Sequence, residues 1–333
     1  MFEHLLVPLD GSERAERALP PALDLLPAAG GEIILLSVPA PAPLSQSKWT
    51  RGVNLWYPDQ ALRRAEQQAT AYLHTVCARH ARAGSTLRPQ IVEGDPASRI
   101  VEVATTEGVD AIVMTTHGYS GFTYWVMGSV TERVVRAATC PILVVRDARP
   151  IRHILVPVDG SLRAEQALLP ALALARRLDA TATLLHVLQP TFVLAPRSFG
   201  WEYLSLELDM AMMATAEQDA RRYVTELAER HAASEVTIRT IVRGGTIAET
   251  ILHVAESEKS DVIAMATHGR TGLRRWVYGS VAEKVLHRVP CTLLIVRVPA
   301  HMLRDDVASL QMPASARQET EKGQPEPAGL SQG

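Results

Sequence analysis

The chain has 333 residues, of which 47% are hydrophobic and 21% are charged, and its formal net charge is −2. This ordinary globular composition excludes a collagen, a coiled-coil rod and a wholly disordered chain, and the balanced charge offers no basic field for nucleic acid or anionic lipid. Aromatic residues make up only 5% of the chain, so we expect a core of Val, Leu, Ile and Ala, as in a parallel sheet covered by helices.

The first half of the chain alternates strand and helix patterns. Alternation of this kind predicts a parallel, doubly wound sheet whose right-handed crossovers place helices on both faces. A Pro-rich loop at 39–58 interrupts the alternation and carries Trp49, Trp56 and Tyr57. In chain order, we predict a strand at 5–9, a helix at 13–28, a strand at 32–38, a helix at 59–83, a strand at 86–93, a helix opened by Asp95 and Pro96, a strand at 111–115, a helix from Ser129 and a strand at 142–145.

The second half repeats the first. Residues 4–12 read HLLVPLDGS and residues 153–161 read HILVPVDGS, with seven of nine positions identical. A period near 150 residues is far too long for a solenoid unit, so it indicates a duplicated domain. We therefore predict one domain at 1–148, a second at 149–298, and a disordered tail at 299–333 that is rich in Pro, Gly, Gln, Ser and Glu.

The N-terminus and the cysteines favour a cytoplasmic protein. Residues 1–4 lack the basic start of a signal peptide, and no apolar run reaches the roughly 18 residues of a membrane helix. Cys77, Cys140 and Cys291 are too few and too scattered for a disulfide framework or a zinc site. We expect no metal site, no nucleic-acid partner and no membrane partner.

Three segments of each copy should meet beyond the carboxyl ends of the strands, where open α/β sheets bind ligands. At the end of the first strand, Asp10 and its repeat Asp159 either accept hydrogen bonds from ribose hydroxyls or open a helix as turn residues. At the end of the second strand, the backbone near Val38 and Val187 could pair with an adenine edge.

The third segment is a Gly-rich loop that enters the last helix. It runs from Thr116-His117-Gly118 to Gly128-Ser129, and Ser129 with Glu132 reads as a capping box. Such a helix start either cradles a phosphate or merely caps the helix, and the repetition of both glycine positions favours phosphate. His117 and His268 are the best general-base candidates, but each follows a strand end and fits a loop-orienting role better, so we assign no catalytic residue.

The chain resembles the universal stress protein family in its tandem two-domain form. The motifs that carry the resemblance are VPLDGS at 7–12 and VPVDGS at 156–161, together with THGYSGFTYWVMGSVTERV at 116–134 and THGRTGLRRWVYGSVAEKV at 267–285. The resemblance covers residues 1–298 and implies two Rossmann-like domains of the adenine nucleotide alpha hydrolase type, each with five parallel strands flanked by helices. It also implies that the last strands pair the two domains within one chain, and it leaves a further homodimer open.

Members of the nucleotide-binding branch hold ATP with a loop of Gly, two residues, Gly, nine residues, Gly and then Ser or Thr, and this chain has Thr115 and Ala266 where the first glycine stands. The resemblance therefore implies ATP as the ligand, with Mg²⁺ left open. The implied nucleotide-binding residues are Pro8, Asp10, Val38, Thr115, His117, Gly118, Gly128, Ser129, Val130, Pro157, Asp159, Val187, Ala266, His268, Gly269, Arg270, Gly279, Ser280 and Val281.

The two loops differ in charge. The second carries Arg270, Arg274 and Arg275, whereas the first has no basic residue between Gly118 and Gly128. We expect the second site to bind ATP better, because Arg is the usual partner of phosphate. Three functions stay open at this point: an ATP-binding regulatory module with at most slow hydrolysis, a nucleotide-free interaction protein that dimerises, and an ATP-hydrolysing enzyme.

Overall fold

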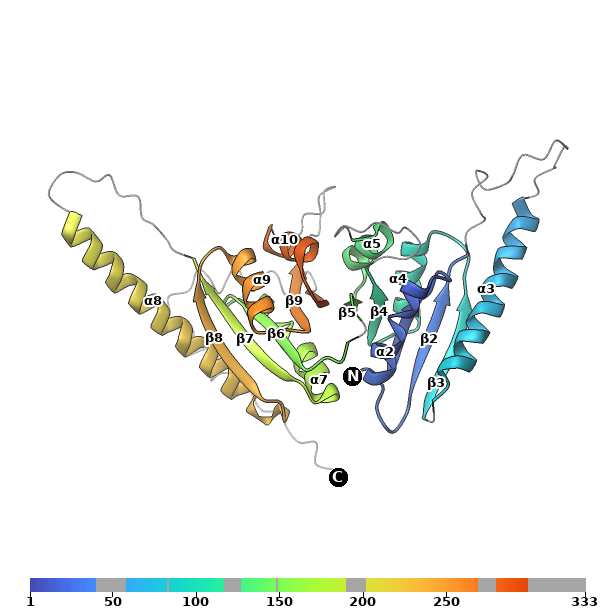
Figure 1. The fold of residues 1–333 in the computed structure, drawn as a ribbon, viewed down its shortest axis with the longest axis horizontal. Coiled ribbons are helices and arrows are strands. Elements are labelled where there is room, and N and C mark those ends of the chain that lie inside the picture. The colour runs from blue at the N-terminus through green and yellow to red at the C-terminus, as the bar shows by residue number, and fades with distance from the viewer. Residues whose placement is uncertain are drawn as a thin grey trace, which may run out of the picture.

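Ten strands form a single sheet in the computed structural model, which describes residues 1–39, 58–82, 84–116, 127–147, 149–189, 202–268 and 280–298 (Figure 1). Their order is β3-β2-β1-β4-β5-β10-β9-β6-β7-β8. Neighbouring strands within each half are parallel, and β5 and β10 join the halves in antiparallel register. The strands are β1 (His4–Pro8), β2 (Gly31–Ser37), β3 (Ser85–Ile91), β4 (Ala111–Thr115), β5 (Ile142–Val145), β6 (His153–Val158), β7 (Thr181–Leu188), β8 (Ile238–Gly244), β9 (Val262–His268) and β10 (Thr292–Val298).

Helices cover both faces of this sheet. One buried cluster joins the sheet to α1, α2, α3, α7 and α8, and the other joins it to α4, α5, α9 and α10. Figure 1 shows α3 and α8 on the outer flanks and α5 and α10 near the middle. The helices are α1 (Glu13–Glu16), α2 (Leu19–Leu25), α3 (Pro58–His80), α4 (Pro96–Thr106), α5 (Ser129–Ala137), α6 (Leu162–Glu165), α7 (Leu168–Leu178), α8 (Glu202–Arg230), the 3₁₀ turn η2 (Ala232–Ser234), α9 (Ile247–Ser257) and α10 (Ser280–Arg288).

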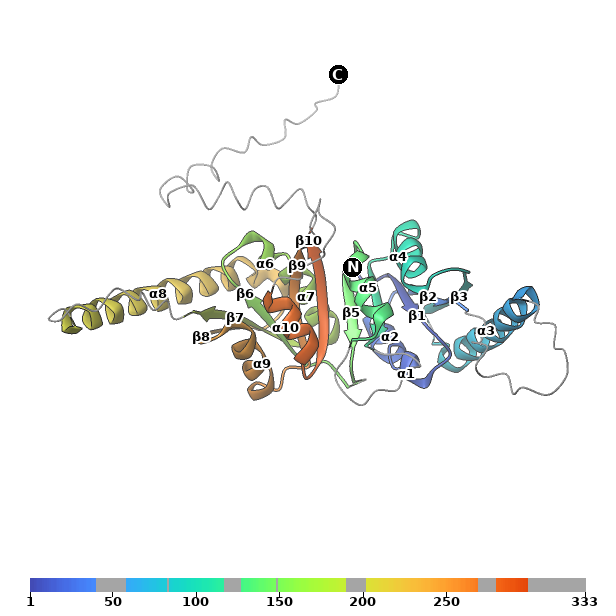
Figure 2. The ribbon, with the colours of Figure 1, turned by 90° about the horizontal axis from the view of Figure 1, so that it is seen from above.

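The strand order sets the place of the sites. In the first domain the chain moves outward from β1 to β2 and β3, then returns to the other side of β1 for β4 and β5. The order reverses between β1 and β4, and in the second domain between β6 and β9, which are the points where doubly wound sheets bind ligands. Because β5 and β10 run antiparallel, strand direction reverses where the two domains meet (Figure 2).

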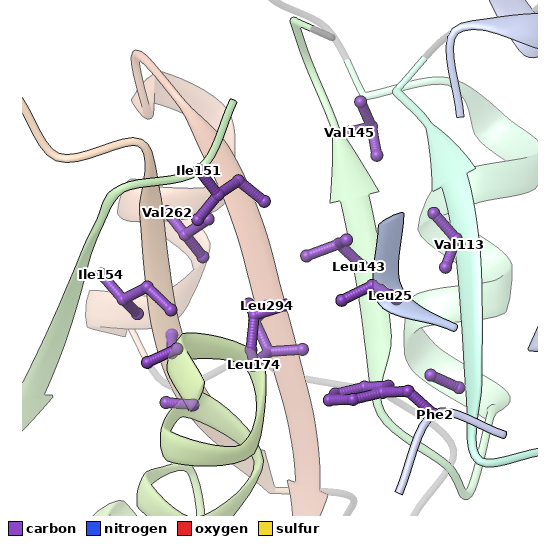
Figure 3. Packing of buried hydrophobic residues seen from close by; sticks show 14 of the residues in the cluster. Phe2, Leu25, Val113, Leu143, Val145, Ile151, Ile154, Leu174, Val262 and Leu294 are labelled. Carbon is purple, nitrogen blue, oxygen red and sulfur yellow. The ribbon is translucent and has the colours of Figure 1, made fainter. Parts of the chain in front are cut away.

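The interface between the domains is part of the core. Leu143 of β5 pairs with Leu294 of β10, and both side chains are buried. Figure 3 shows Phe2 and Leu25 of the first domain near the same interface as Leu174 of the second. One hydrophobic cluster therefore runs through both domains, as expected for pairing within the chain.

Two arginine side chains stabilise the interface between the domains, because each caps a helix of the opposite domain. Arg146 donates to the carbonyl of Val289, just after α10, at 2.7 Å. Its repeat Arg297 donates to the carbonyl of Ala137 at the end of α5 at 2.8 Å. Helix C-termini carry partial negative charge and unbonded carbonyls, so each guanidinium meets a matching acceptor.

The predicted fold class is confirmed, and one predicted helix is wrong. The expected helix at 13–28 is divided into α1 and α2, since Pro20 and Pro21 lack the N–H groups that would continue the ladder. The amides of Arg17 and Ala18 instead bond three residues back, to the carbonyls of Arg14 and Ala15. The predicted strand at 111–115 matches β4.

Two other expectations are limited by the part of the chain that the structure describes. The predicted tail at 299–333 and the Pro-rich loop residues Trp49, Trp56 and Tyr57 lie outside it. Among the described residues, no helix is both long enough and apolar enough to span a bilayer.

Candidate functional site

A cavity of about 290 Å³ lies at the switch point of the first domain. Residues that follow three parallel strands line it together with the start of α5 and the first turns of α4. The lining residues are Pro8, Leu9, Asp10, Ala15, Leu36, Val38, Pro96, Ile100, Met114, Thr115, Gly128, Ser129, Val130 and Thr131.

A second cavity of about 260 Å³ occupies the equivalent place in the second domain. Its lining includes Arg163 from α6, and it has Ala266 and Ala282 where the first cavity has Thr115 and Thr131. The residues that line it are Pro157, Val158, Asp159, Ser161, Arg163, Ala164, Leu185, Val187, Ile247, Ile251, Met265, Ala266, Val281 and Ala282.

The turn after β1 uses its aspartate for local structure as well as for the cavity. One carboxylate oxygen of Asp10 accepts hydrogen bonds from Ser12 N–H at 3.0 Å and Ser12 Oγ–H at 2.6 Å. Ser12 Oγ then accepts from Ala15 N–H at 3.1 Å and caps α1. Gly11 between them has φ +83°, a left-handed conformation that favours glycine. The helix-opening interpretation of Asp10 is thus part of its role.

The repeat reproduces this turn closely. Asp159 accepts from Ser161 N–H and Oγ–H at 3.0 and 2.6 Å, and Ser161 caps α6 through Ala164 N–H at 3.1 Å. Gly160 has φ +85°. Both copies therefore hold an aspartate at the cavity mouth in the same orientation relative to the turn.

The start of α5 is built differently from the sequence prediction. Gly128 is the N-cap and no side chain caps the helix, so the predicted capping box of Ser129 and Glu132 is wrong. Glu132 pairs with Arg136 one turn later. A glycine cap leaves the first-turn amides of Ser129 and Val130 without a competing side chain, and helix geometry gives these amides no intrahelical acceptor.

The second copy also departs from the capping prediction, because Ser280 is the first residue of α10 rather than the residue before it. Val281 and Ala282 of this first turn line the second cavity. The start of α10 therefore borders its cavity as the start of α5 does.

An apolar wall faces the helix start in each cavity. In the first domain it consists of Leu36, Val38, Ile100 and Met114, which belong to or pack against one hydrophobic cluster. The second domain presents Leu185, Val187, Ile251 and Met265 at the equivalent places. Each cavity thus combines an apolar side with a polar helix start, a combination typical of small-molecule sites.

The structure brings twelve of the predicted residues together at the two cavities. Those at the first cavity are Pro8, Asp10, Val38, Thr115, Gly128, Ser129 and Val130. Those at the second are Pro157, Asp159, Val187, Ala266 and Val281. The backbones of His268 and Ser280 lie at the end of β9 and the start of α10. The remaining predicted residues, His117, Gly118, Gly269, Arg270 and Gly279, lie outside the described residues, as do Arg274 and Arg275.

Sequence reasoning missed several of the cavity residues, among them Ile100, Ile251, Arg163 and Thr131. Ile100 and Ile251 come from the buried stripes of α4 and α9, which look like ordinary core positions in the sequence. Arg163 follows the Asp-Gly-Ser turn and Thr131 follows the Gly-Ser pair. Their distances from the repeated motifs can be read from the sequence, but no local pattern marks them as cavity residues.

The cysteines are poor nucleophiles in this fold. Burial raises the pKa of the Cys140 thiol to about 11 and that of Cys291 to about 12. Burial also raises the pKa of Cys77. Thiolate is the reactive form, so little of it is present near neutral pH. Among the described residues, no group of three or more His, Cys, Asp or Glu could hold a metal ion.

The fold and the two cavities define a class of protein, in which two doubly wound α/β domains follow each other in one chain and each has a ligand-sized cavity at its switch point. The family model described as "Universal stress protein family" matches residues 1–146 and again residues 150–297. The chain therefore belongs to the universal stress protein family and carries two copies of its domain.

Some relatives are similar to about half of this chain, and others are similar to most of its length. A universal stress protein of Methanocaldococcus jannaschii is 34% identical over 149 residues, which cover 44% of this chain and 83% of the relative. The universal stress protein YxiE of Bacillus subtilis is 30% identical over 148 residues, 44% of this chain and all of the relative. The crystal structure of a universal stress protein from Archaeoglobus fulgidus has a TM-score of 0.64 at 20% identity and covers 89% of this chain and 99% of that one.

Proposed function

We propose that this chain is an ATP-binding regulatory module of the stress response, with one adenine-nucleotide site in each domain and at most slow hydrolysis. Family membership supports a nucleotide-binding stress-response module as the general role. The identity of the nucleotide as ATP is the finer part of the proposal.

The start of α5 at the first cavity is the observation that carries the proposal. Gly128, Ser129 and Val130, which are the N-cap and the first two residues of the nine-residue helix α5, line the cavity. Amides at a helix start, reinforced by the helix dipole, form a good phosphate site. A carboxylate at Asp10 is within the same cavity and suits ribose hydroxyls, which can donate to it.

The apolar wall supports a purine on the opposite side of the cavity. Val38 follows β2 and Ile100 projects from α4, so a flat ring between them would be covered by hydrocarbon. The cavity of about 290 Å³ is close to the lower limit of common ligand sites. Mg²⁺ would contact mainly phosphate oxygens and water, which fits the scarcity of clustered carboxylates among the described residues.

Charge supports stronger triphosphate binding in the second domain. Arg163 lines the second cavity, whereas its counterpart Arg14 is exposed and is not among the described residues that line the first. The loop arginines Arg270, Arg274 and Arg275 add to this positive charge in the sequence. An arginine beside a phosphate gives a charge-assisted hydrogen bond, which is stronger than a neutral one.

Nucleotide released from the protein tests the proposal. We expect gently purified protein to release an adenine nucleotide on denaturation, and we expect calorimetric titration of the stripped protein with ATP to give two sites, the tighter one in the second domain. GTP is the matched control, since it carries the same phosphates on a different base. Absence of both released nucleotide and binding heat would favour the nucleotide-free interaction protein, and multiple-turnover release of phosphate would favour the enzyme.

A further inference from the structure

Thr131 closes the base of the loop that leads from β4 to α5. Its hydroxyl donates to the carbonyl of Thr115 at 3.0 Å and lies 3.3 Å from the carbonyl of Thr116. The amide of Gly128 donates to the same Thr116 carbonyl at 2.8 Å. The strand exit and the first turn of α5 are thus tied together by both backbone and side chain.

These contacts differ from the usual behaviour of a helical threonine. A threonine inside a helix generally bonds back to a carbonyl three or four residues earlier in its own helix. Thr131 bonds instead to residues 15 and 16 positions earlier, on a different element. The side chain is 3% exposed, so the hydroxyl is committed to these carbonyls rather than to solvent.

The second domain has no hydroxyl at this position. Ala282 replaces Thr131 in the first turn of α10, in the otherwise similar sequences GSVTERV and GSVAEKV. Ala282 is also buried and also lines its cavity. Ala282 therefore has no side-chain hydroxyl with which to make the hydrogen bonds that Thr131 makes in the first domain.

We propose that Thr131 is a positioning residue that fixes the phosphate-binding helix start of the first domain before any ligand arrives. The inference rests on the proposed nucleotide function, because it concerns the same cradle. The hydrogen bonds of Thr131 already hold the helix start in the free protein, so less conformational entropy is lost when a ligand binds. Affinity rises for this reason, without a new contact to the ligand. The first site gains affinity from preorganisation, and the second site, with Ala282, depends more on its positive charge.

Three variants of the full chain test the role of the hydroxyl. Thr131→Val removes the hydroxyl with nearly the same shape, Thr131→Ser keeps it, and Ala282→Thr introduces it in the second domain. The first readout is hydrogen exchange of the Gly128 amide without nucleotide. The second is ATP affinity at each site, assigned by the protection that ATP gives to α5 or α10.

We expect Thr131→Val to accelerate exchange at Gly128 and to weaken ATP at the first site by about fivefold to tenfold, the effect of one to two net hydrogen bonds. Thr131→Ser should restore both values, and Ala282→Thr should tighten the second site by a smaller factor. A global loss of stability alone would change the thermal midpoint without rescue by Ser.

Unchanged exchange and unchanged affinity in Thr131→Val would overturn the inference. If wild-type protein binds no nucleotide, the proposed function fails, yet the exchange measurement on the free protein still decides whether Thr131 ties the cradle. The two failures are therefore distinguishable.

Discussion

The two cavities of this chain have similar surroundings in the fold and different side chains. Both lie between an Asp-Gly-Ser turn and a helix start, and the turns agree to within a tenth of an ångström in the hydrogen bonds of Asp10 and Asp159. The first has Thr131 as a side-chain tie, and the second has Ala282 with Arg163 in the cavity wall.

The difference separates two ways of holding a polyanion. Preorganisation acts by limiting the motion of the cradle, and it is insensitive to salt. Positive charge acts through Coulomb attraction and weakens as ionic strength rises. The sheet topology imposes the same backbone geometry on both copies of a duplicated fold. One copy can therefore rely on preorganisation while the other relies on positive charge.

The largest expected effect on ATP affinity comes from placing a carboxylate at the start of α5. Gly128 is the N-cap of α5 with φ −59° and ψ 146°, values that an aspartate adopts readily. Gly128→Asp should therefore preserve or strengthen the helix while its carboxylate takes the first-turn amides and repels phosphate. We expect ATP affinity at the first site to fall by on the order of 100-fold, measured by calorimetry.

The matched variant is Gly279→Asp in the second copy. It should leave the first site unchanged and weaken only the second. If Gly128→Asp left both sites at wild-type affinity, the start of α5 would not be the phosphate site.

A tenfold effect is expected from the charge of the second cavity. Arg163→Gln keeps the length of the side chain and removes its charge, so ATP affinity at the second site should fall by about tenfold and lose part of its salt dependence. Titrations at low and high salt measure both changes.

Arg14→Gln is the control for the same chemistry in the first domain, where Arg14 is exposed. We expect it to change the affinity of the first site by less than twofold, roughly the limit for an exposed charge at a distance. Equal losses in the two variants would contradict the assignment of charge to the second site alone.

The smallest effect concerns acid stability. Arg133 makes a bidentate ion pair with Asp95: its Nη1 donates to Oδ1 at 2.7 Å and its Nη2 donates to Oδ2 at 2.6 Å. Asp95 also caps α4 by accepting a hydrogen bond from Ser98 N–H. The Arg133 guanidinium, with help from Ser98, holds the pKa of Asp95 well below its usual value of 3.8. The second domain has Thr246 and Lys284 at the equivalent positions, and Thr246 makes no side-chain cap bond.

Because the folded pKa is lowered, the contribution of Asp95 to stability is present above pH 3.8 and disappears as the pH falls toward the folded value. Asp95→Asn keeps a good N-cap and removes this titration, so the free energy of unfolding should fall less steeply with acid below that pH. Denaturant unfolding at several pH values measures the slope. The double variant Thr246→Asp/Lys284→Arg should steepen the acid limb, and an unaltered slope in both variants would show that the pair is thermodynamically neutral.

The sequence predicted the parts of the fold that depend on local pattern. The repeat identified two α/β domains, and the buried run at 111–115 and the Asp95-Pro96 helix start were found where the structure has them. Local rules misled us where two of them competed. Pro20 and Pro21 divided an apolar helical pattern, and a glycine at 128 became the cap in place of the Ser that follows it.

The site shows the same division. Asp10 and Asp159 follow recognisable strand ends, and Gly128 precedes the helix after β4. The place of these residues at the switch points could therefore be predicted from the alternation of strands and helices. Thr131, Ile100 and Arg163 could not, because their roles depend on carbonyls and cavity walls contributed by distant segments. A single sequence does not indicate which buried threonine bonds to the backbone carbonyls of another element.

The sequence by itself determined the duplication, the parallel α/β class and the strand ends at which the two cavities lie, since these follow from periodicity and from the direction of parallel strands. The tertiary structure alone decided that ten strands join in one sheet, that arginines of one domain cap helices of the other, and that the Thr131 hydroxyl bonds to the end of β4. Those features depend on contacts between residues far apart in the chain, and no local pattern of side chains specifies them.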